Sequence, residues 1–356
     1  MTLSILIWVP LAGSLIASLL PARLAGRLAV LWSAITLGIA ISFVARFHTG
    51  HAGLQFVTDK VWISTLGIHY KLGLDGLNVA LVLTATIIFC AALLWASTHE
   101  WERARIFYFH FGLAESAVLG AFCAQDLALF VAFFDLMLIP FYFLTGIWGG
   151  PDRVRATTRL VIYTLVGSFF MLVASVATGV LASEQHHTPL NFAISALQAL
   201  PLSHTTQTWV FLAFAVAFLV KMPLVPFHGW LPDGYKAMPI PAVAVFSAIL
   251  SKVAAYGFLR IVLPLFPYAS AHFQTLMLII AVVSILWATL VAMTTPDARL
   301  VIYTLVGSFF MLVAAIATGA LASSQHGTPL TFVLSSLRGL PLSHTTQTWV
   351  FLAFAV

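Results

Sequence analysis

The stretch from Trp209 to Leu224 reads Trp-Val-Phe-Leu-Ala-Phe-Ala-Val-Ala-Phe-Leu-Val-Lys-Met-Pro-Leu, and its one charged residue is Lys221. This continuous apolar run predicts a membrane-spanning helix rather than a strand. An isolated charge at the bilayer centre costs roughly 3 kcal/mol or more, so such residues usually belong to an ion or proton path. Pro223 and Pro226 lack a backbone N–H, so the helix is expected to break just after the lysine.

The rest of the chain is equally apolar. Its 356 residues are 61% hydrophobic and 8% charged, with a mean hydropathy of +1.04, which excludes an ordinary soluble globular domain. Apolar windows long enough to cross a bilayer recur along the sequence, and they predict an all-α, polytopic transmembrane bundle of about 10–11 helices with a discontinuous seventh helix. The expected spans are 3–21, 28–46, 76–96, 106–123, 127–148, 159–182, 208–224, 240–262, 273–295, 299–322 and 346–356.

Two more charged residues interrupt apolar windows. Asp135 lies in the window 127–148, and Lys252 lies in the window 240–262. An unpaired buried charge is costly, so Asp135 is the natural partner of Lys221. The three residues together are the predicted catalytic proton path. A lysine that reaches to the membrane interface is the simpler alternative for Lys221, but apolar residues flank it on both sides.

Other polar residues are secondary candidates. Glu115 is a second carboxylate inside an apolar window, and His228 follows the predicted break, where it could donate or accept a proton. Asp126, between two windows, is better explained as a helix cap than as a relay. The chain has no Cys-x-x-Cys pair, haem signature or glycine-rich nucleotide loop. We therefore expect no cofactor and no metal on this chain. The sequence also has no basic stripe with interleaved aromatic residues, so we expect no nucleic-acid partner.

The loop charges predict the orientation. With the N-terminus outside, the inner loops hold nine Lys and Arg residues and the outer loops hold five, which agrees with the positive-inside rule. The inner residues are Arg23, Arg27, Arg103, Arg105, Arg153, Arg155, Arg159, Lys236 and Arg299; the outer residues are Arg46, Lys60, Lys71, Arg260 and Arg338. We expect an outer loop at 47–75 that covers the membrane interface.

A long internal repeat marks the C-terminal region. Residues 299–356 repeat residues 159–216, and 47 of the 58 positions are identical. A duplication or a gene-assembly artefact is the expected origin, because functional repeats need complete units. The copy should take the local conformation of the original without a second proton site.

Four regions are expected. They are 1–105, with the first three helices and the outer loop; 106–262, an antiporter-like five-helix unit; 263–298, the ninth helix; and 299–356, the truncated duplicate.

Three motifs carry a family resemblance. Lys-Met-Pro-Leu-Val-Pro at 221–226 is followed by His-Gly-Trp-Leu-Pro-Asp at 228–233. Tyr-Lys-Leu-Gly-Leu-Asp-Gly-Leu-Asn stands at 70–78, and Phe-Phe-Asp-Leu-Met-Leu-Ile-Pro begins the run 133–150. Together they resemble the subunit M (chain 4) family of antiporter-like subunits in respiratory complex I, the proton-translocating NADH-quinone oxidoreductase. The resemblance covers about residues 1–298.

The resemblance implies a fourteen-helix fold of two inverted five-helix units. It also implies a proton channel with a carboxylate–lysine pair, here Asp135 and Lys221, and a second lysine on the central axis, here Lys252. Other subunits of the enzyme would carry the redox and quinone chemistry and drive this one, with no redox active site on this chain. The implied partners are the other membrane subunits, the lipid bilayer and protons, and the implied location is the bacterial inner membrane.

The chain departs from the family pattern at several places. The family has glutamate where this chain has Asp135, so contact with Lys221 could need a bridging water. The segment 234–241 reads Gly-Tyr-Lys-Ala-Met-Pro-Ile-Pro, which differs from the family's usual His-Thr-Glu-Ala-Pro-Thr. The repeat after Arg299 stands where the second inverted unit continues in the family, so the glutamate of the family's twelfth helix has no counterpart.

Two alternatives remain open from the sequence. The first is a subunit of a multi-subunit sodium/proton antiporter or of a membrane-bound hydrogenase, because these complexes share the motifs. The second is an incomplete, non-functional fragment. Neighbouring genes would separate an oxidoreductase from an antiporter.

Overall fold

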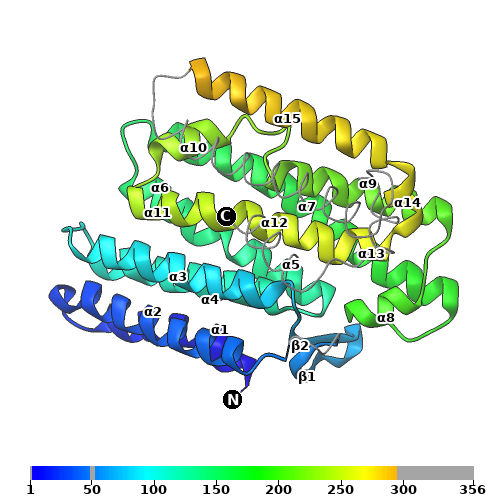
Figure 1. Cartoon of the computed structure of the whole chain (residues 1–356), viewed down its shortest axis with the longest axis horizontal. Coiled ribbons are helices and arrows are strands. Elements are labelled where there is room, and N and C mark those ends of the chain that lie inside the picture. Colours follow the sequence, from blue (N-terminus) through cyan, green and yellow to red (C-terminus); the bar gives the residue numbers. More distant parts are fainter. Residues whose placement is uncertain (1, 49–52, 295–356) are drawn as a thin grey trace, which may run out of the picture. The chain divides into compact units, whose positions relative to one another are not determined.

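The computed structural model of this protein describes residues 2–48 and 53–294, and most of that part of the chain is helical (Figure 1). The chain divides into two compact units, Met1–Val283 and Ser284–Val356. The first unit contains every candidate site residue. The helices expected at 299–322 and 346–356, and the conformation of the 299–356 repeat, lie outside the described residues.

Four apolar helices come first in the chain, each on a predicted span. They are α1 Leu3–Leu19, α2 Ala22–Ala45, α3 Asn78–Ser97 and α4 Ala104–Cys123. Helix α4 packs against the other three and is buried over most of its length. Gly112 makes the close crossing of α1 and α4 possible, because a Cβ atom there would collide with Ser14 and with the backbone of Pro10.

The window 127–148 forms two helices with almost no gap between them. They are α5 Leu127–Leu136 and α6 Leu138–Trp148. Pro140 explains the break, because it has no N–H to donate to the carbonyl of Leu136 four residues earlier. Asp135 therefore lies at the end of α5, in the last turn before the break.

The next elements contain the predicted discontinuous helix. They are α7 Arg153–His186, α8 Ile194–Ala199, α9 His204–Lys221 and α10 Leu231–Ala237. Helix α9 ends at Lys221, and no helix is assigned from Met222 to Trp230. The prolines at 223 and 226 thus stop the helix as predicted.

The span that holds Lys252 is a composite helix. Its parts are α11 Ile240–Val245, the π-helical segment η2 Phe246–Leu250, α12 Ser251–Gly257, a second π-helical segment η3 Phe258–Val262, and α13 Leu263–Leu265. Helices α14 Pro267–His272 and α15 Gln274–Thr294 follow. Lys252 thus lies in the α-helical stretch between two π segments, and such segments are frequent at functional sites.

The loop expected at 47–75 contains a β-hairpin that the sequence analysis did not predict. Strand β1 Gln55–Ile63 pairs antiparallel with β2 Ile68–Leu74 through the short helix η1 Ser64–Leu66. Gly67 has a φ of 61°, and a Cβ there would collide with the carbonyl of Leu190. A turn in the left-handed region beside another backbone segment needs glycine.

Asp126 joins this hairpin to the helices. Its carboxylate accepts hydrogen bonds from the backbone N–H groups of Ala128 and Leu129 in α5, at 3.0 and 3.1 Å, and from that of His69 in β2 at 3.1 Å. The predicted role of Asp126 as a helix cap is confirmed. The carboxylate also fixes β2 against the start of α5, because it satisfies donors from both.

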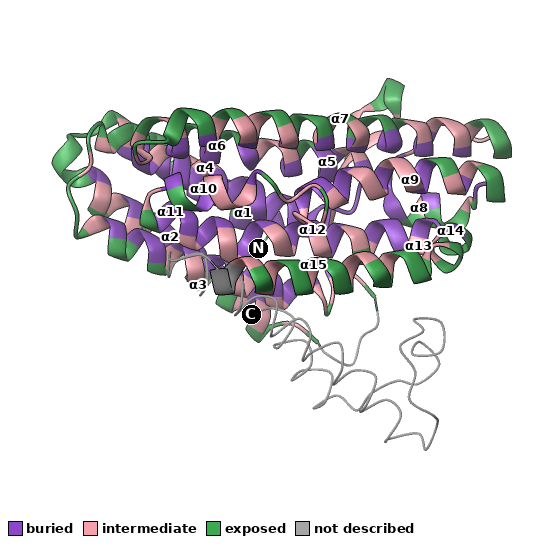
Figure 2. Ribbon diagram, turned by 90° about the horizontal axis from the view of Figure 1, so that it is seen from above, coloured by how far each residue is buried: buried purple, intermediate pink, exposed green. Residues whose placement is uncertain are grey.

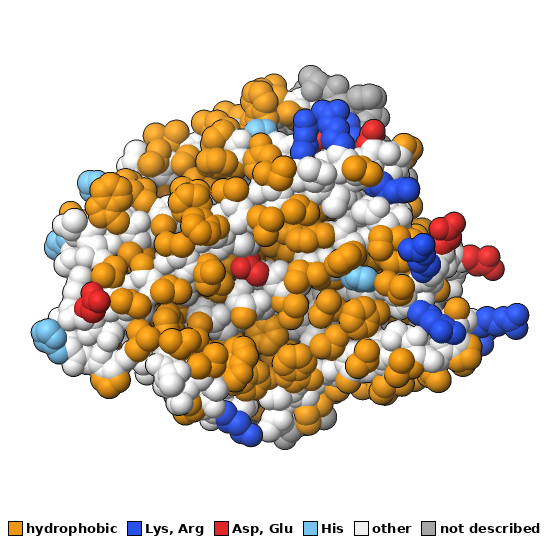
Figure 3. Space-filling view, turned by 180° about the vertical axis from the view of Figure 1, so that it is seen from behind, with side chains coloured by type: hydrophobic (Ala, Val, Ile, Leu, Met, Phe, Trp, Pro, Cys, Tyr) orange, Lys and Arg blue, Asp and Glu red, His pale blue; other side chains and the backbone are white. Residues whose placement is uncertain are grey.

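The burial pattern fits a protein surrounded by lipid or other apolar surfaces. Helix α7 is exposed along one side (Figure 2), where Leu165, Phe169 and Leu172 are 57%, 64% and 52% exposed. Hydrophobic side chains cover most of the face in Figure 3, and Lys and Arg gather toward its margins. Seven helices in the described residues are long and apolar enough to cross a membrane.

Candidate functional site

The predicted partners Asp135 and Lys221 lie in direct contact. Nζ of Lys221 lies 2.6 Å from Oδ1 of Asp135. The shorter aspartate therefore reaches the lysine without the bridging water that its length suggested. The lysine side chain is 1% exposed and that of Asp135 is 35% exposed. The pair thus consists of an enclosed cation and a carboxylate that opens to the surface of the chain.

Ser168 of α7 completes a triangle with the pair. Its hydroxyl donates to Oδ1 of Asp135 at 2.6 Å and accepts from Nζ of Lys221 at 2.9 Å. The ring of Phe134 lies 4.2 Å from Nζ and adds a cation–π contact. Helices α5 and α7 thus supply the groups that stabilise the buried ammonium at the end of α9.

The break after Lys221 has a specific hydrogen-bond arrangement. Pro223 has no N–H for the carbonyl of Leu219, and the N–H of Leu224 donates to that carbonyl instead, at 2.9 Å. The carbonyl of Val220 is thereby left for another donor. The indole Nε1 of Trp230 donates to it at 3.2 Å. Trp230 is fully buried, so its side chain closes the end of α9 next to the lysine.

Sequence analysis missed Ser168 and Trp230. Ser168 is an uncharged residue inside an apolar window and gives no distinct signal in the sequence. Trp230 belongs to the motif at 228–233, and its place just beyond the two prolines was the available signal. A buried indole usually finds a hydrogen-bond acceptor, and a proline break leaves carbonyls that need donors.

Replacing Trp230 with phenylalanine is expected to lower the stability of the protein. The variant keeps an aromatic ring but leaves the carbonyl of Val220 buried without its donor, which costs about 1–3 kcal/mol. The end of α9 should loosen, and with it the position of Lys221. Thermal unfolding of the protein would show this. Trp62→Phe, at a hairpin residue that is 57% exposed, is the matched control. Equal behaviour of the two variants would contradict the role of Trp230.

The structure places the other predicted residues apart from this triangle. Lys252 lies in α12, which packs against α9 and α4, and no ion pair within the described residues involves it. Glu115 of α4 accepts a hydrogen bond from Ser33 of α2 at 3.2 Å. His228 is half-buried in the turn between α9 and α10. Of the five predicted site residues, Asp135 and Lys221 are in direct contact. Lys252, Glu115 and His228 do not belong to this contact.

No group of three or more His, Cys, Asp and Glu side chains that could hold a metal occurs in the described part of the chain. Cys90 and Cys123 are both free thiols. Asp135 and Lys221 form an acid–base pair whose members both contact the hydroxyl of Ser168, and such a pair suits proton exchange.

A family model described as NADH:quinone oxidoreductase/Mrp antiporter, transmembrane, matches residues 124–323. The chain belongs to this family. The matched region contains Asp135, Ser168, Lys221 and Lys252, and membership makes the chain an integral membrane protein. The predictions of an antiporter-like, all-α fold and of this family are confirmed.

Two relatives named as quinone oxidoreductase subunits are similar along most of this chain. NADH-quinone oxidoreductase subunit M of Rhodobacter capsulatus is 34% identical over 339 residues, which are 91% of this chain and 65% of the relative. NAD(P)H-quinone oxidoreductase chain 4 of Acaryochloris marina is 32% identical over 296 residues, 81% of this chain and 54% of the relative. The chain thus spans less than two thirds of the length of these curated relatives.

Solved structures show the same fold. A chain of respiratory complex I from Thermus thermophilus is 28% identical, with a TM-score of 0.77 over 99% of this chain and 71% of that one. The Mrp complex from Dietzia sp. contains a chain that is 19% identical, with a TM-score of 0.73 over 92% of this chain and 38% of that one. The second likeness concerns the fold alone.

Proposed function

We propose that this chain is an M-type membrane subunit of an NADH-quinone oxidoreductase that conducts protons through Asp135 and Lys221. The carrying observation is the enclosed ammonium of Lys221 in direct contact with Asp135 and Ser168. Other membrane subunits would be its partners, and electron transfer in other subunits would drive it. The proposed location is the bacterial inner membrane with the N-terminus outside.

The triangle of Asp135, Ser168 and Lys221 supplies a way to load and release one proton. With the carboxylate in contact, the ammonium is stabilised by attraction at short range and by the ring of Phe134. If Asp135 takes up a proton or turns away, the enclosed ammonium loses its counter-charge, and burial then favours the neutral amine. The proton can then pass onward along the composite helix that carries Lys252. Because the side chain of Asp135 is 35% exposed, it can exchange protons with the surroundings of the chain.

Replacing Asp135 with asparagine tests this function. The amide keeps the shape of the side chain but cannot take up a proton or neutralise Lys221. Membrane vesicles that contain the assembled complex would be given NADH, and proton uptake would be measured per electron transferred to quinone. In Asp135→Asn, we expect the number of protons taken up per electron to fall by the contribution of this subunit. In Asp135→Glu, which keeps a carboxylate, most of that contribution should return.

Asp152→Asn is the control, because Asp152 is exposed before α7. A normal proton-to-electron ratio in Asp135→Asn would refute the proposed path. Sodium-dependent proton movement without electron transfer would instead favour the antiporter alternative.

A further inference from the structure

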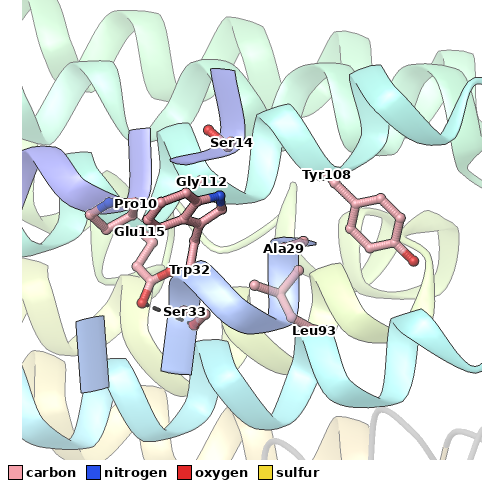
Figure 4. A pocket seen from close by; sticks show the side chains of 9 residues that line it. All are labelled: Pro10, Ser14, Ala29, Trp32, Ser33, Leu93, Tyr108, Gly112 and Glu115. Atoms are coloured by element: carbon pink, nitrogen blue, oxygen red, sulfur yellow. Dashed lines mark hydrogen bonds between the residues drawn. The ribbon is translucent and has the colours of Figure 1, made fainter. Parts of the chain in front are cut away.

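A small cavity lies beside Glu115, on the side of α4 that faces α1, α2 and α3 (Figure 4). Its lining includes Ser14 of α1, Trp32 and Ser33 of α2, and Tyr108 and Glu115 of α4. The space open to the centre of a water-sized sphere is ≈ 10 Å³. One water molecule needs about 10–15 Å³ by this measure. The cavity is therefore at the lower limit of the size that holds one water, and it has no room for two.

The polar groups around the cavity are incompletely satisfied by the protein. Glu115 is 1% exposed, and within the described residues its carboxyl has one hydrogen-bond partner, the hydroxyl of Ser33. The indole Nε1 of Trp32 is buried and has no hydrogen-bond partner in the described part of the chain. Buried polar groups are normally paired with protein or with ordered water. A carboxyl and an indole N–H on one water-sized cavity thus meet the conditions for a bound water.

Glu115 also has no cation beside it. None of the ion pairs within the described residues includes it, whereas Asp135 has Lys221. An ionised carboxylate enclosed without a cation is far more costly than a neutral carboxylic acid. A carboxylic acid has an O–H to donate as well as oxygens that accept, so it suits a water that accepts from Trp32 and exchanges hydrogen bonds with Glu115.

We propose that this cavity binds one water molecule between Glu115 and Trp32, and that the hydrated Glu115 carboxyl is a second proton-binding site, separate from the Asp135–Lys221 pair. Figure 4 shows the carboxyl of Glu115 next to the hydroxyl of Ser33, with the indole of Trp32 beside them. The partners of Asp135 are in α7 and α9, while those of Glu115 are in α2. The site does not depend on the proposed function, because it stands whether or not Asp135 conducts protons.

Infrared difference spectroscopy of the assembled complex in lipid tests the proposal. A protonated Glu115 should give a carboxylic-acid carbonyl band that disappears in Glu115→Gln, which keeps the shape of the side chain. Trp32→Phe removes the N–H that holds the water, and it should shift that band while the protein remains folded. Trp209→Phe, at a position that is 70% exposed, should leave the band where it is.

Each result decides the proposal. Loss of the band in Glu115→Gln with a shift in Trp32→Phe supports the hydrated proton site. A spectrum unchanged by Glu115→Gln overturns it, because no protonated carboxyl is then present. A band that is lost in Glu115→Gln but unmoved in Trp32→Phe also overturns it, because no water then links the two groups. A high-resolution electron cryo-microscopy map of the complex should in addition show ordered density in the cavity, and an empty cavity would contradict the proposal.

Discussion

Replacing Lys221 with alanine is expected to stop proton translocation through this subunit. The variant removes the titratable group at the centre of the site and leaves Asp135 with only the hydroxyl of Ser168. The remaining side chains of the triangle, a carboxylate and a hydroxyl, cannot hold a proton as an enclosed cation. Proton uptake per electron in vesicles of the assembled complex should fall by the whole share of this subunit.

Lys221→Arg separates charge from proton exchange. Arginine keeps a positive partner for Asp135 but remains protonated under all ordinary conditions. We therefore expect Lys221→Arg to assemble and still fail to translocate protons. Lys60→Ala, at an exposed hairpin residue, is the control for removal of a lysine. If Lys221→Ala pumped with an unchanged proton-to-electron ratio, the site would have no role in translocation.

The alanine variant should also be less stable. Breaking a buried pair by removing one partner costs about 3–5 kcal/mol when the other charge stays buried and unpaired. Here Asp135 is 35% exposed, so water can solvate it and the loss should be smaller. Asp135→Ala is the more damaging change, because it leaves the enclosed ammonium of Lys221 without a counter-charge. Thermal unfolding of the two variants in detergent would show this order.

Long apolar runs made the helices predictable. An apolar run of about 20 residues usually forms a membrane-crossing helix. Helices α3, α4 and α7 lie where such runs predicted them. The break after Lys221 followed from Pro223 and Pro226, because a missing N–H acts locally. The pairing of Asp135 with Lys221 followed from charge, since an apolar setting leaves few ways to satisfy either residue.

Features that depend on contacts between distant segments could not be predicted in this way. The hairpin at 55–74 is held partly by a backbone hydrogen bond from the N–H of Phe192 to the carbonyl of Gly67, which no local pattern reveals. Ser168 carries no charge, and its role depends on the rotation of α7. The charge of Glu115 was visible in the sequence, but the face of α4 that carries it was not. The cavity beside it depends on how four helices pack.

Replacing Asp75 with alanine is expected to give the largest loss of stability outside the proton path. Asp75 follows β2 and makes two kinds of contact. Its Oδ1 accepts from the N–H groups of Leu77 and Asn78 at the start of α3, both at 2.9 Å. Its Oδ2 lies 2.7 Å from Nε of Arg260, which belongs to η3. One carboxylate therefore fixes the start of α3 to the composite helix that carries Lys252.

The two contacts can be separated by substitution. Loss of the capping contact costs about 1 kcal/mol. Loss of the charge partner leaves Arg260, whose side chain is 28% exposed, largely buried without a counter-charge, which costs up to about 3–5 kcal/mol. Asp75→Asn keeps an oxygen for the cap and removes the charge, so it should fall between wild type and Asp75→Ala. Asp59→Ala is the control, because its pairs with His69 and Lys71 lie at the surface and such pairs contribute about 0–1 kcal/mol.

Thermal unfolding of the complex in detergent would rank these variants, and a buried thiol gives a local measurement. Cys123, at the end of α4, is fully buried. The backbone carbonyl of the preceding residue, Phe122, accepts a hydrogen bond from the side-chain amide of Asn78 at 2.9 Å. If Asp75 holds this junction together, Asp75→Ala should make Cys123 react with a thiol reagent well before the protein unfolds, in a Cys90→Ser background that removes the other described cysteine. The same rate of labelling in Asp75→Ala and Asp59→Ala would show that Asp75 does not anchor the helix of Lys252. A faster rate with an unchanged unfolding temperature would place the loosening at this junction rather than in the whole unit.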